Sequence, residues 1–333
     1  MVIDPHPGRH RHPRRATATA TGVNPIAPVV MKRSSAALFA ALIAVAVSGC
    51  QPSGDVAPPN GAIDIGAGRT IFLDCQGDGS PTVLIIPGKG SYAEAWNVVV
   101  PQDDPIRGSN YDDIEQAALT PSRDAVQPTV ARTTRVCAYD RPNTRPDGAD
   151  QSTPVHQPHT VAAAVDDLLA LIAAAHLGGP FVVVAHSYGG LIADLLTRTH
   201  PELVSGLVMV DPVSEFLPAV GTPVQNAAFD RDGRVPATAG GEGVLFDDAF
   251  ARINAAPPLP NVPSAVLSSG KFMPPERLSA DNYTQAQIHR ANDMLAAELG
   301  TDNRVVADSG HNVMLYSPRE VAQAIDGIVA KVG

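Results

Sequence analysis

The chain has 333 residues, of which 44% are hydrophobic and 17% are charged, and its formal net charge is −10. This length allows one large domain or two smaller ones, and the apolar content is enough for a buried core. Residues 1–49 hold six of the 24 basic side chains and one of the 34 acidic ones, so the rest of the chain is strongly acidic, at −15. Such a charge disfavours nucleic acid and anionic membrane surfaces as partners.

The first 49 residues have the composition of targeting sequence rather than of a folded domain. Residues 31–49 begin with Met31-Lys32-Arg33, continue with an apolar run over 36–47 and end in small residues, as secretory signal peptides do. The apolar run is shorter than the roughly 20 residues that a membrane-spanning helix needs. Because a signal lies at the extreme amino terminus, we interpret Met31 as the true start and residues 1–30 as an upstream extension. The alternative is a real basic tail.

The signal ends in Val47-Ser48-Gly49-Cys50, which resembles a bacterial lipobox. In a lipobox the cysteine becomes the lipidated first residue of the mature protein. The resemblance therefore implies export and a lipid anchor on the outer face of the bacterial cell membrane. Each methylene of the acyl chains that is buried in the bilayer contributes about 0.8 kcal/mol to the free energy of membrane binding. The alternative is an ordinary signal peptide with a cysteine at its cleavage site. Residues 50–61 are rich in Pro and Gly, as a tethering linker would be.

Two further cysteines, Cys75 and Cys137, follow the linker. In an exported protein, two leftover cysteines are expected to form a disulfide. Two buried free thiols are the alternative. A metal site is disfavoured, because no histidine or additional cysteine lies nearby at ligand spacing.

From residue 62 to residue 333, segments with strand character alternate with segments of helical period. The expected strands are 69–75, 82–86, 135–139, 181–185, 207–210, 264–267 and 304–307, and the expected helices are 161–176, 189–200, 283–299 and 318–332. Such alternation predicts an α/β domain with a doubly wound, mostly parallel sheet that has helices on both faces.

Residues 212–262 interrupt this alternation. They are rich in Gly, Pro and Asp, and only 246–253 has a plausible helical pattern. A long insert in a compact domain is usually functional. This insert follows the carboxyl end of a strand, where sheets of this kind bind ligands, so we expect it to form a short cap or lid over the site.

The segment Phe181-Val-Val-Val-Ala-His-Ser187-Tyr-Gly-Gly-Leu191 joins a buried strand to a helix. A serine in so sharp a turn requires small residues two positions before and after it, and Ala185 and Gly189 meet this requirement. The amino terminus of the helix also offers its dipole and backbone N–H groups to a developing oxyanion. The pattern predicts Ser187 as a catalytic nucleophile. The alternative is a structural serine in a turn.

With this segment, the chain resembles the α/β-hydrolase superfamily over about residues 69–332. Thr82-Val-Leu-Ile-Ile-Pro87-Gly-Lys89-Gly90 resembles the strand and oxyanion loop of that family, although Pro87 stands where the family usually has His. The resemblance implies that the oxyanion would be bound by the backbone N–H groups of Lys89 and Tyr188. Arg135-Val-Cys-Ala-Tyr139-Asp140-Arg141-Pro resembles the next strand and its turn, where the polar residues are expected to be structural rather than catalytic.

The expected base is His311, in Asp308-Ser-Gly-His311-Asn312 between the last strand and the last helix. A serine hydroxyl needs such a base because it is a weak nucleophile at neutral pH. This position matches the histidine loop of the family and the chain order Ser, acid, His. The side chain of His186 is expected to alternate away from that of Ser187. The other histidines of the domain have no family role and are expected on loops or helix surfaces: His156, His159, His176, His200 and His289.

The expected acid is Asp211, directly after the strand Leu207–Val210. It would hold His311 in the correct tautomer and stabilise the imidazolium. Glu276, Asp281 and Asp308 remain alternative acids, and Asp211 could instead only cap the segment that follows it.

A serine at the elbow implies acyl transfer through an acyl-enzyme, and we expect hydrolysis of carboxylic esters on a small-molecule or lipid substrate. Other acyl-transfer chemistry (amidase, peptidase, thioesterase or acyltransferase) is one alternative, and a catalytically silent binding protein on the same fold is another. No metal or organic cofactor is expected, because the histidines and acids lack ligand spacing.

Overall fold

The computed structural model describes residues 60–145 and 151–333. The predicted upstream extension, the signal peptide, the lipidation residue Cys50 and nearly all of the predicted linker lie outside these ranges. Among the described residues, no helix combines the length and the apolar character needed to cross a bilayer.

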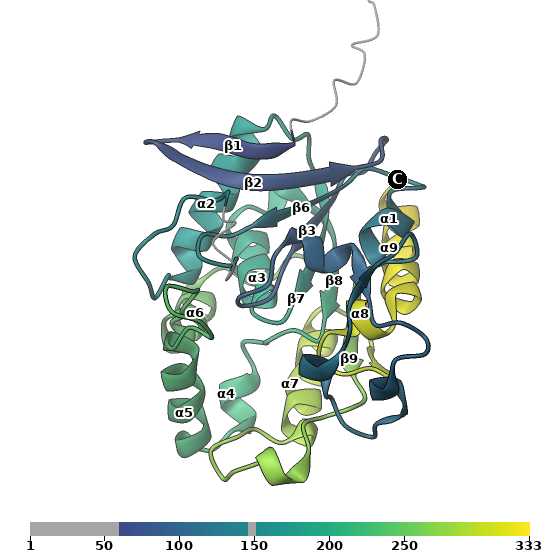
Figure 1. Cartoon of the computed structure of the whole chain (residues 1–333). Coiled ribbons are helices and arrows are strands. Elements are labelled where there is room, and N and C mark those ends of the chain that lie inside the picture. The colour runs from purple at the N-terminus through teal and green to yellow at the C-terminus, as the bar shows by residue number, and fades with distance from the viewer. Residues whose placement is uncertain (1–59, 146–150) are drawn as a thin grey trace, which may run out of the picture. The chain divides into compact units, whose positions relative to one another are not determined.

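A twisted eight-stranded sheet forms the centre of the domain (Figure 1). Its strands, in spatial order, are β1 (Gly61–Gly66), β2 (Arg69–Gln76), β6 (Val136–Asp140), β3 (Val83–Ile86), β7 (Phe181–His186), β8 (Val204–Val210), β9 (Ser264–Ser269) and β10 (Asn303–Val306). Strands β1 and β2 pair antiparallel to each other, and β2 pairs antiparallel to β6. The pairs from β6 to β10 are parallel, which confirms the expected mostly parallel sheet.

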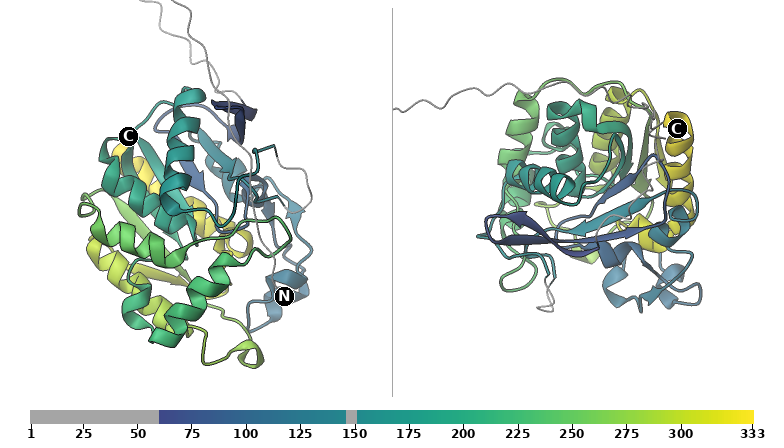
Figure 2. Two further views of the ribbon diagram at one scale, coloured as in Figure 1. Left: turned by 90° about the vertical axis from the view of Figure 1, so that its left-hand side faces the viewer. Right: turned by 90° about the horizontal axis from the view of Figure 1, so that it is seen from above.

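Helices cover both faces of the sheet (Figure 2). One face packs against α2 (Val161–Ala174), α3 (Gly189–Thr199) and α7 (Gln285–Glu298), and α6 (Phe246–Ala255) joins the same core by packing on α2 and α3. The other face packs against α1 (Val126–Val130), α8 (Val313–Tyr316) and α9 (Pro318–Val332). Neighbouring residues of a strand point to opposite faces, so Leu84 and Ile86 contact the first layer whereas Val83 and Ile85 contact the second. Burial on both faces explains why β3 and β7 are continuous apolar runs.

The insert contains more helix than the sequence indicated. Besides α6, which was expected near residues 246–253, it holds α4 (Leu217–Val220) and α5 (Pro223–Arg234). Helix α5 begins with a capping box between Thr222 and Gln225, and Pro223 occupies its first turn. This start signal is present in the sequence. The sequence analysis did not predict this helix, because Gly, Asp and Arg make the interior of α5 resemble a linker.

The connection from β3 to β6 is a second irregular region. It contains the short 3₁₀ helices η1 (Ala93–Trp96), η2 (Pro105–Gly108) and η3 (Ile114–Gln116) and a two-stranded pair, β4 (Val98–Val99) with β5 (Thr120–Pro121). Tyr111 forms an isolated bridge with Phe272, and Lys271 Nζ donates to the carbonyl of Arg107 at 3.0 Å. These two contacts hold the β3–β6 connection against the loop that follows β9.

Cys75 and Cys137 are direct partners across the antiparallel strands β2 and β6, and their sulfurs are bonded. The disulfide predicted from the sequence is therefore present in the structure, and it joins segments that are 62 residues apart. The alternative of two free thiols is not what the structure contains.

A buried arginine cluster joins α3 to the insert and to α7. Arg198 contacts Asp194 within α3, Glu215 at the start of the insert at 2.9 Å, and Glu298 of α7 at 3.1 Å. Burial, followed by the charge of Asp194, raises the pKa of Glu215 to about 9. Burial raises the pKa of Asp194 as well, so the cluster keeps a proton to higher pH than isolated carboxyl groups would.

Candidate active site

Ser187 lies in the sharp turn between β7 and α3, with a positive backbone φ of 52°. The turn brings the start of α3 so close to β3 that a Cβ on Gly189 would lie 2.3 Å from the carbonyl oxygen of Ile86. A Cβ on Gly190 would lie 2.7 Å from Pro212. The glycines after Ser187 are thus required by close backbone approach, as the elbow pattern predicted.

His311 and Asp211 form the expected pair. The Nδ1 atom of His311 lies 2.7 Å from Oδ2 of Asp211, which is 3% exposed at the end of β8. Ser269 also binds this carboxylate: its N–H donates to Oδ1 at 3.0 Å, and its hydroxyl donates to Oδ2 at 2.9 Å. Since Asp211 has no free proton to donate, His311 carries its proton on Nδ1, and Nε2 is left as the basic atom.

The protonation states fit this arrangement. Burial alone would raise the pKa of Asp211, but the hydrogen bonds from His311 and Ser269 and the charge of the imidazole outweigh it and lower the pKa. Burial alone would lower the pKa of His311, but the hydrogen bond to Asp211 and the charges of Asp211 and Asp112 raise it above 6.5. Asp211 is therefore ionised, and the pKa of His311 is raised from its ordinary value.

Ser187, His311 and Asp211 line the same cavity. The Ser187 hydroxyl has no hydrogen-bond partner among the described residues. Catalytic hydrogen bonds are often long before substrate binds and tighten only in the complex. The elements that converge here are the carboxyl ends of β7 and β8 and the loop after β10, as expected for an open parallel sheet.

The alternative acids lie elsewhere. Asp281 faces Arg231 at 3.9 Å, Glu276 belongs to the short helix η5 (Pro275–Arg277), and Asp308 is exposed. The carboxylates that hydrogen-bond His311 are instead those of Asp211 and Asp112. Among the candidate acids from the sequence, Asp211 is the one that contacts the His311 imidazole in the structure.

Asp112 is a residue of the site that the sequence analysis missed. Its Oδ2 accepts the backbone N–H of His311 at 2.8 Å, and its Oδ1 accepts the Tyr316 hydroxyl at 2.9 Å. A Cβ on Gly310 would overlap this carboxylate, at 2.2 Å. Asp112 lies in the irregular β3–β6 connection, where no sequence motif marks it. The glycine at position 310, next to His311, was the one indirect sign in the sequence that another group lies close to the histidine loop.

Two further histidines lie at the site. His186 is buried, donates from Nε2 to the carbonyl of His311 at 3.0 Å, and its ring lies 4.7 Å from that of His311. Burial lowers its pKa to about 3, so it is neutral and is no competing base. His289 was expected on a helix surface, but it lines the cavity and contacts the carbonyl of Ser269 at 2.8 Å.

The two expected oxyanion donors lie in the turns next to the cavity. Tyr188 is the N-cap residue directly before α3, and Lys89 lines the cavity from the loop after β3. Within the described ranges, the N–H groups of both residues are free of hydrogen bonds to protein. The Lys89 side chain donates to the carbonyls of Val235 at 2.8 Å and Asp232 at 3.3 Å, so it fastens the loop to the insert.

The cavity has a volume of about 570 Å³ and lies between the carboxyl ends of the strands and the insert. Its apolar wall comes from the insert and the region of α7, and consists of Val213, Leu217, Phe229, Phe246, Tyr283 and Ile288. The aromatic rings of this wall contact one another, with Phe229 stacked on Phe246 at 4.2 Å. The charged residues that line the cavity are of both signs: Lys89, Asp112, Glu115, Asp211, Asp232, Lys271 and Arg277. Among the described residues, no group of three or more histidines, cysteines or carboxylates has the arrangement of a metal site.

Comparison with known proteins matches the chain to a protein family. The family model described as "Alpha/beta hydrolase family" matches residues 83–324, which is most of the chain. An uncharacterized protein of Schizosaccharomyces pombe (strain 972) is 36% identical over 86 residues, a match that spans 26% of this chain and 15% of that protein.

Two solved structures show the same fold. The N-acyl homoserine lactone degrading enzyme Est816 is similar with a TM-score of 0.52 and 19% identity, over 80% of this chain and 100% of that one. The epoxide hydrolase CorEH is similar with a TM-score of 0.50 and 16% identity, over 81% of this chain and 98% of that one.

Proposed function

Because the chain belongs to the alpha/beta hydrolase family, we propose that it is a serine hydrolase that cleaves carboxylic esters through an acyl-enzyme. The observation that supports this most is the set of contacts around one cavity, in which Asp211 binds Nδ1 of His311 while Ser187 lies in the elbow. The fold alone would not suffice, since an epoxide hydrolase shares it. The chemistry depends on the serine at the elbow.

The proposed reaction uses each group in turn. His311 Nε2 takes the hydroxyl proton of Ser187 while Oγ attacks the ester carbonyl carbon. The carbonyl oxygen becomes an oxyanion that the N–H groups of Lys89 and Tyr188 bind. The C–O bond to the alcohol then breaks, and His311 returns the proton to the leaving alcohol. Water attacks the acyl-enzyme by the same route, which releases the acid and restores Ser187.

The cavity supports an ester with an apolar acyl or alcohol part. The aromatic and aliphatic side chains of the insert and α7 offer an apolar surface, and 570 Å³ is in the range of small-molecule sites. We propose that the protein acts at the cell envelope, exported and lipid-anchored through Cys50. The sequence features of residues 31–50 support this location.

Other acyl-transfer chemistries use the same groups, and a binding protein on this fold would keep the cavity. Labelling with a fluorophosphonate probe separates enzyme from binding protein, because the probe reacts only with an activated serine. We expect the chain from residue 51 to be labelled on Ser187 and the variant Ser187→Ala to remain unlabelled. Folded protein that stays unlabelled would contradict the proposal.

A panel of p-nitrophenyl esters, the matching anilides and thioesters, each tested with and without added alcohol, then identifies the reaction. Faster ester turnover than anilide or thioester turnover is the expected result. Ester products in the presence of alcohol would indicate an acyltransferase, and turnover of anilides alone would indicate an amidase.

A further inference from the structure

We propose that Glu242 is a positioning residue through which the insert orients the oxyanion loop, and this inference rests on the proposed function. Glu242 lies between α5 and α6, and its side chain is 3% exposed. The oxyanion loop is defined here as Pro87–Gly90. Two kinds of contact, one direct and one through Arg141, join Glu242 to that loop.

The direct contact is a hydrogen bond from the backbone N–H of Gly90 to Oε2 of Glu242, at 2.6 Å. The second contact is a buried ion pair, in which Arg141 donates to Oε1 at 2.7 Å and to Oε2 at 3.1 Å. Three donors from two segments therefore share one carboxylate. Hydrogen bonds to a charged group of this kind are short and strong, so they restrict the loop more than neutral bonds would.

Arg141 transmits this restraint to the expected donor. Its guanidinium donates to the carbonyls of Pro87 at 2.7 Å and Gly88 at 2.6 Å. The carbonyl of Gly88 and the N–H of Lys89 belong to one planar trans peptide group, in which they point in opposite directions. Fixing the carbonyl on Arg141 thus fixes the direction of the Lys89 N–H.

The same guanidinium lies over the ring of Tyr188, 5.4 Å from its centre. Tyr188 supplies the other expected donor, so one buried cation contacts both sides of the oxyanion hole. Arg141 was predicted to be structural rather than catalytic, and its contacts agree with a role that acts through backbone groups. Loss of its partner would leave a charged group buried and unpaired, which is strongly unfavourable.

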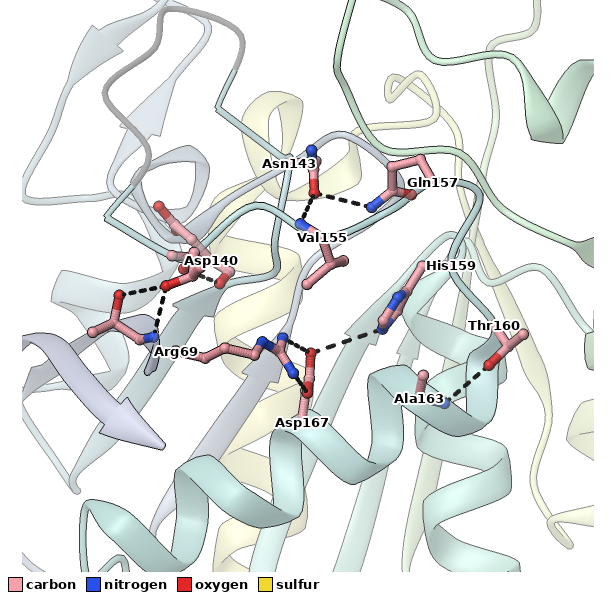
Figure 3. A network of polar contacts seen from close by, with 12 residues as sticks. Arg69, Asp140, Asn143, Val155, Gln157, His159, Thr160, Ala163 and Asp167 are labelled. Atoms are coloured by element: carbon pink, nitrogen blue, oxygen red, sulfur yellow. Dashed lines mark hydrogen bonds and ion pairs between the residues drawn. The ribbon is translucent and has the colours of Figure 1, made fainter. Parts of the chain in front are cut away.

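The segment that carries Glu242 is itself held in place. The amide of Asn143 donates to the carbonyl of Gly240 at 2.8 Å, and Gln157 accepts the N–H of Gly243 at 3.0 Å. Figure 3 shows that Asn143 and Gln157 also contact each other, so they form one support beside the segment. Glu242 therefore sits on a fixed part of the insert and not on a free loop.

The test compares Glu242→Gln with a matched variant, Asp167→Asn. Asp167 also forms a two-bond pair with an arginine, Arg69, at 2.6–2.7 Å (Figure 3), but on α2 and β2 away from the cavity. Both substitutions keep the side-chain shape and remove one charge. The Gln at 242 cannot accept from all three donors, because one of its two polar atoms is itself a donor.

We expect Glu242→Gln to lower kcat for an ester by about 10-fold to 10³-fold with KM changed less than threefold, since loss of one oxyanion donor lowers kcat by about 10²–10³. Asp167→Asn should lower kcat less than twofold. Each variant is assayed below its own unfolding transition. If the two variants lose kcat equally, or if Glu242→Gln changes KM alone, the inference is overturned.

A second readout separates positioning from general damage. A trifluoromethyl ketone forms an oxyanion on the catalytic serine, so its inhibition constant should rise in proportion to the loss of kcat/KM in Glu242→Gln. An unchanged inhibition constant would contradict the inference even if kcat fell. Failure of the proposed function looks different, because the wild-type chain would then neither hydrolyse esters nor bind the ketone.

Discussion

Replacing Asp211 with Asn tests the base most directly, because one backbone group decides how the new side chain must lie. The N–H of Ser269 donates to Oδ1 of Asp211 and cannot reverse its polarity. The Asn oxygen must therefore occupy that position, and the Asn NH₂ must occupy the position that faces His311 Nδ1. The Ser269 hydroxyl can rotate to accept from the same NH₂.

An NH₂ group facing Nδ1 forces the proton of His311 onto Nε2. Nε2 then cannot take the proton of Ser187, although every side chain remains in place. In serine hydrolases the wrong tautomer lowers kcat by about 10⁴, which corresponds to about 5 kcal/mol in the activation free energy. We expect Asp211→Asn to lose turnover of this order while its fold is retained.

Steady-state turnover of an activated ester, together with circular dichroism and a thermal melt, checks this expectation. Ser269→Ala is the control, because it keeps the decisive N–H and removes only one hydroxyl, and it should lose less than tenfold. A rate for Asp211→Asn within tenfold of wild type would refute the tautomer argument. Another group would then have to orient His311.

Three other expectations concern pH and stability. The base must be neutral, and the pKa of His311 is raised above 6.5, so kcat/KM should rise with pH through a pKa above 6.5. The variant Asp112→Asn removes a neighbouring negative charge but can still accept the backbone N–H of His311. It should therefore shift the rise in kcat/KM to lower pH. In the folded chain the pKa of Glu215 is about 9, whereas in the unfolded chain it is near 4.5. The free energy of unfolding should therefore fall as pH rises between these values, and Glu215→Gln should gain stability relative to wild type over the same range. Plots of unfolding free energy against pH that run parallel for the two proteins would contradict this. Replacing Cys75 and Cys137 with Ala should lower the free energy of unfolding by about 4 kcal/mol, because the disulfide closes a loop of 62 residues. Urea unfolding measures this free energy, and an unchanged midpoint would show that the disulfide contributes little.

The fold could be predicted because strands that are buried on both faces appear in the sequence as continuous apolar runs, and helices appear as apolar residues repeated at helical spacing. The order of the strands could not be obtained from such runs alone. Strand β1 was missed, since Gly61–Gly66 is an edge strand with only Ile63 buried. One buried residue is too weak a strand pattern to be recognised beside the Pro/Gly-rich composition of the preceding residues. The strand forms because it pairs with β2, and this pairing is a tertiary contact that the sequence pattern does not show.

The site could be predicted where backbone sterics impose a pattern. Ser187 needs small neighbours at fixed positions, so a short motif marks it. Asp112 and Glu242 act on backbone groups of segments that are more than 100 residues away. A carboxylate that binds a distant N–H requires no particular neighbours in sequence, so these residues could not be found without the structure.

The left-handed backbone at Ser187 and at Asp211, with φ of 52° and 41°, has a consequence for how this protein could change over time. Each such conformation in a residue with a side chain is unfavourable by about 1–2 kcal/mol relative to glycine. A descendant that no longer needed the side chain of Ser187 could accept glycine there and become more stable, whereas glycine at 211 would leave the Ser269 N–H without the acceptor that Asp211 provides. Retention of Ser187, the proposed nucleophile, is therefore a trade of stability for activity, and selection on stability alone would favour glycine at that position.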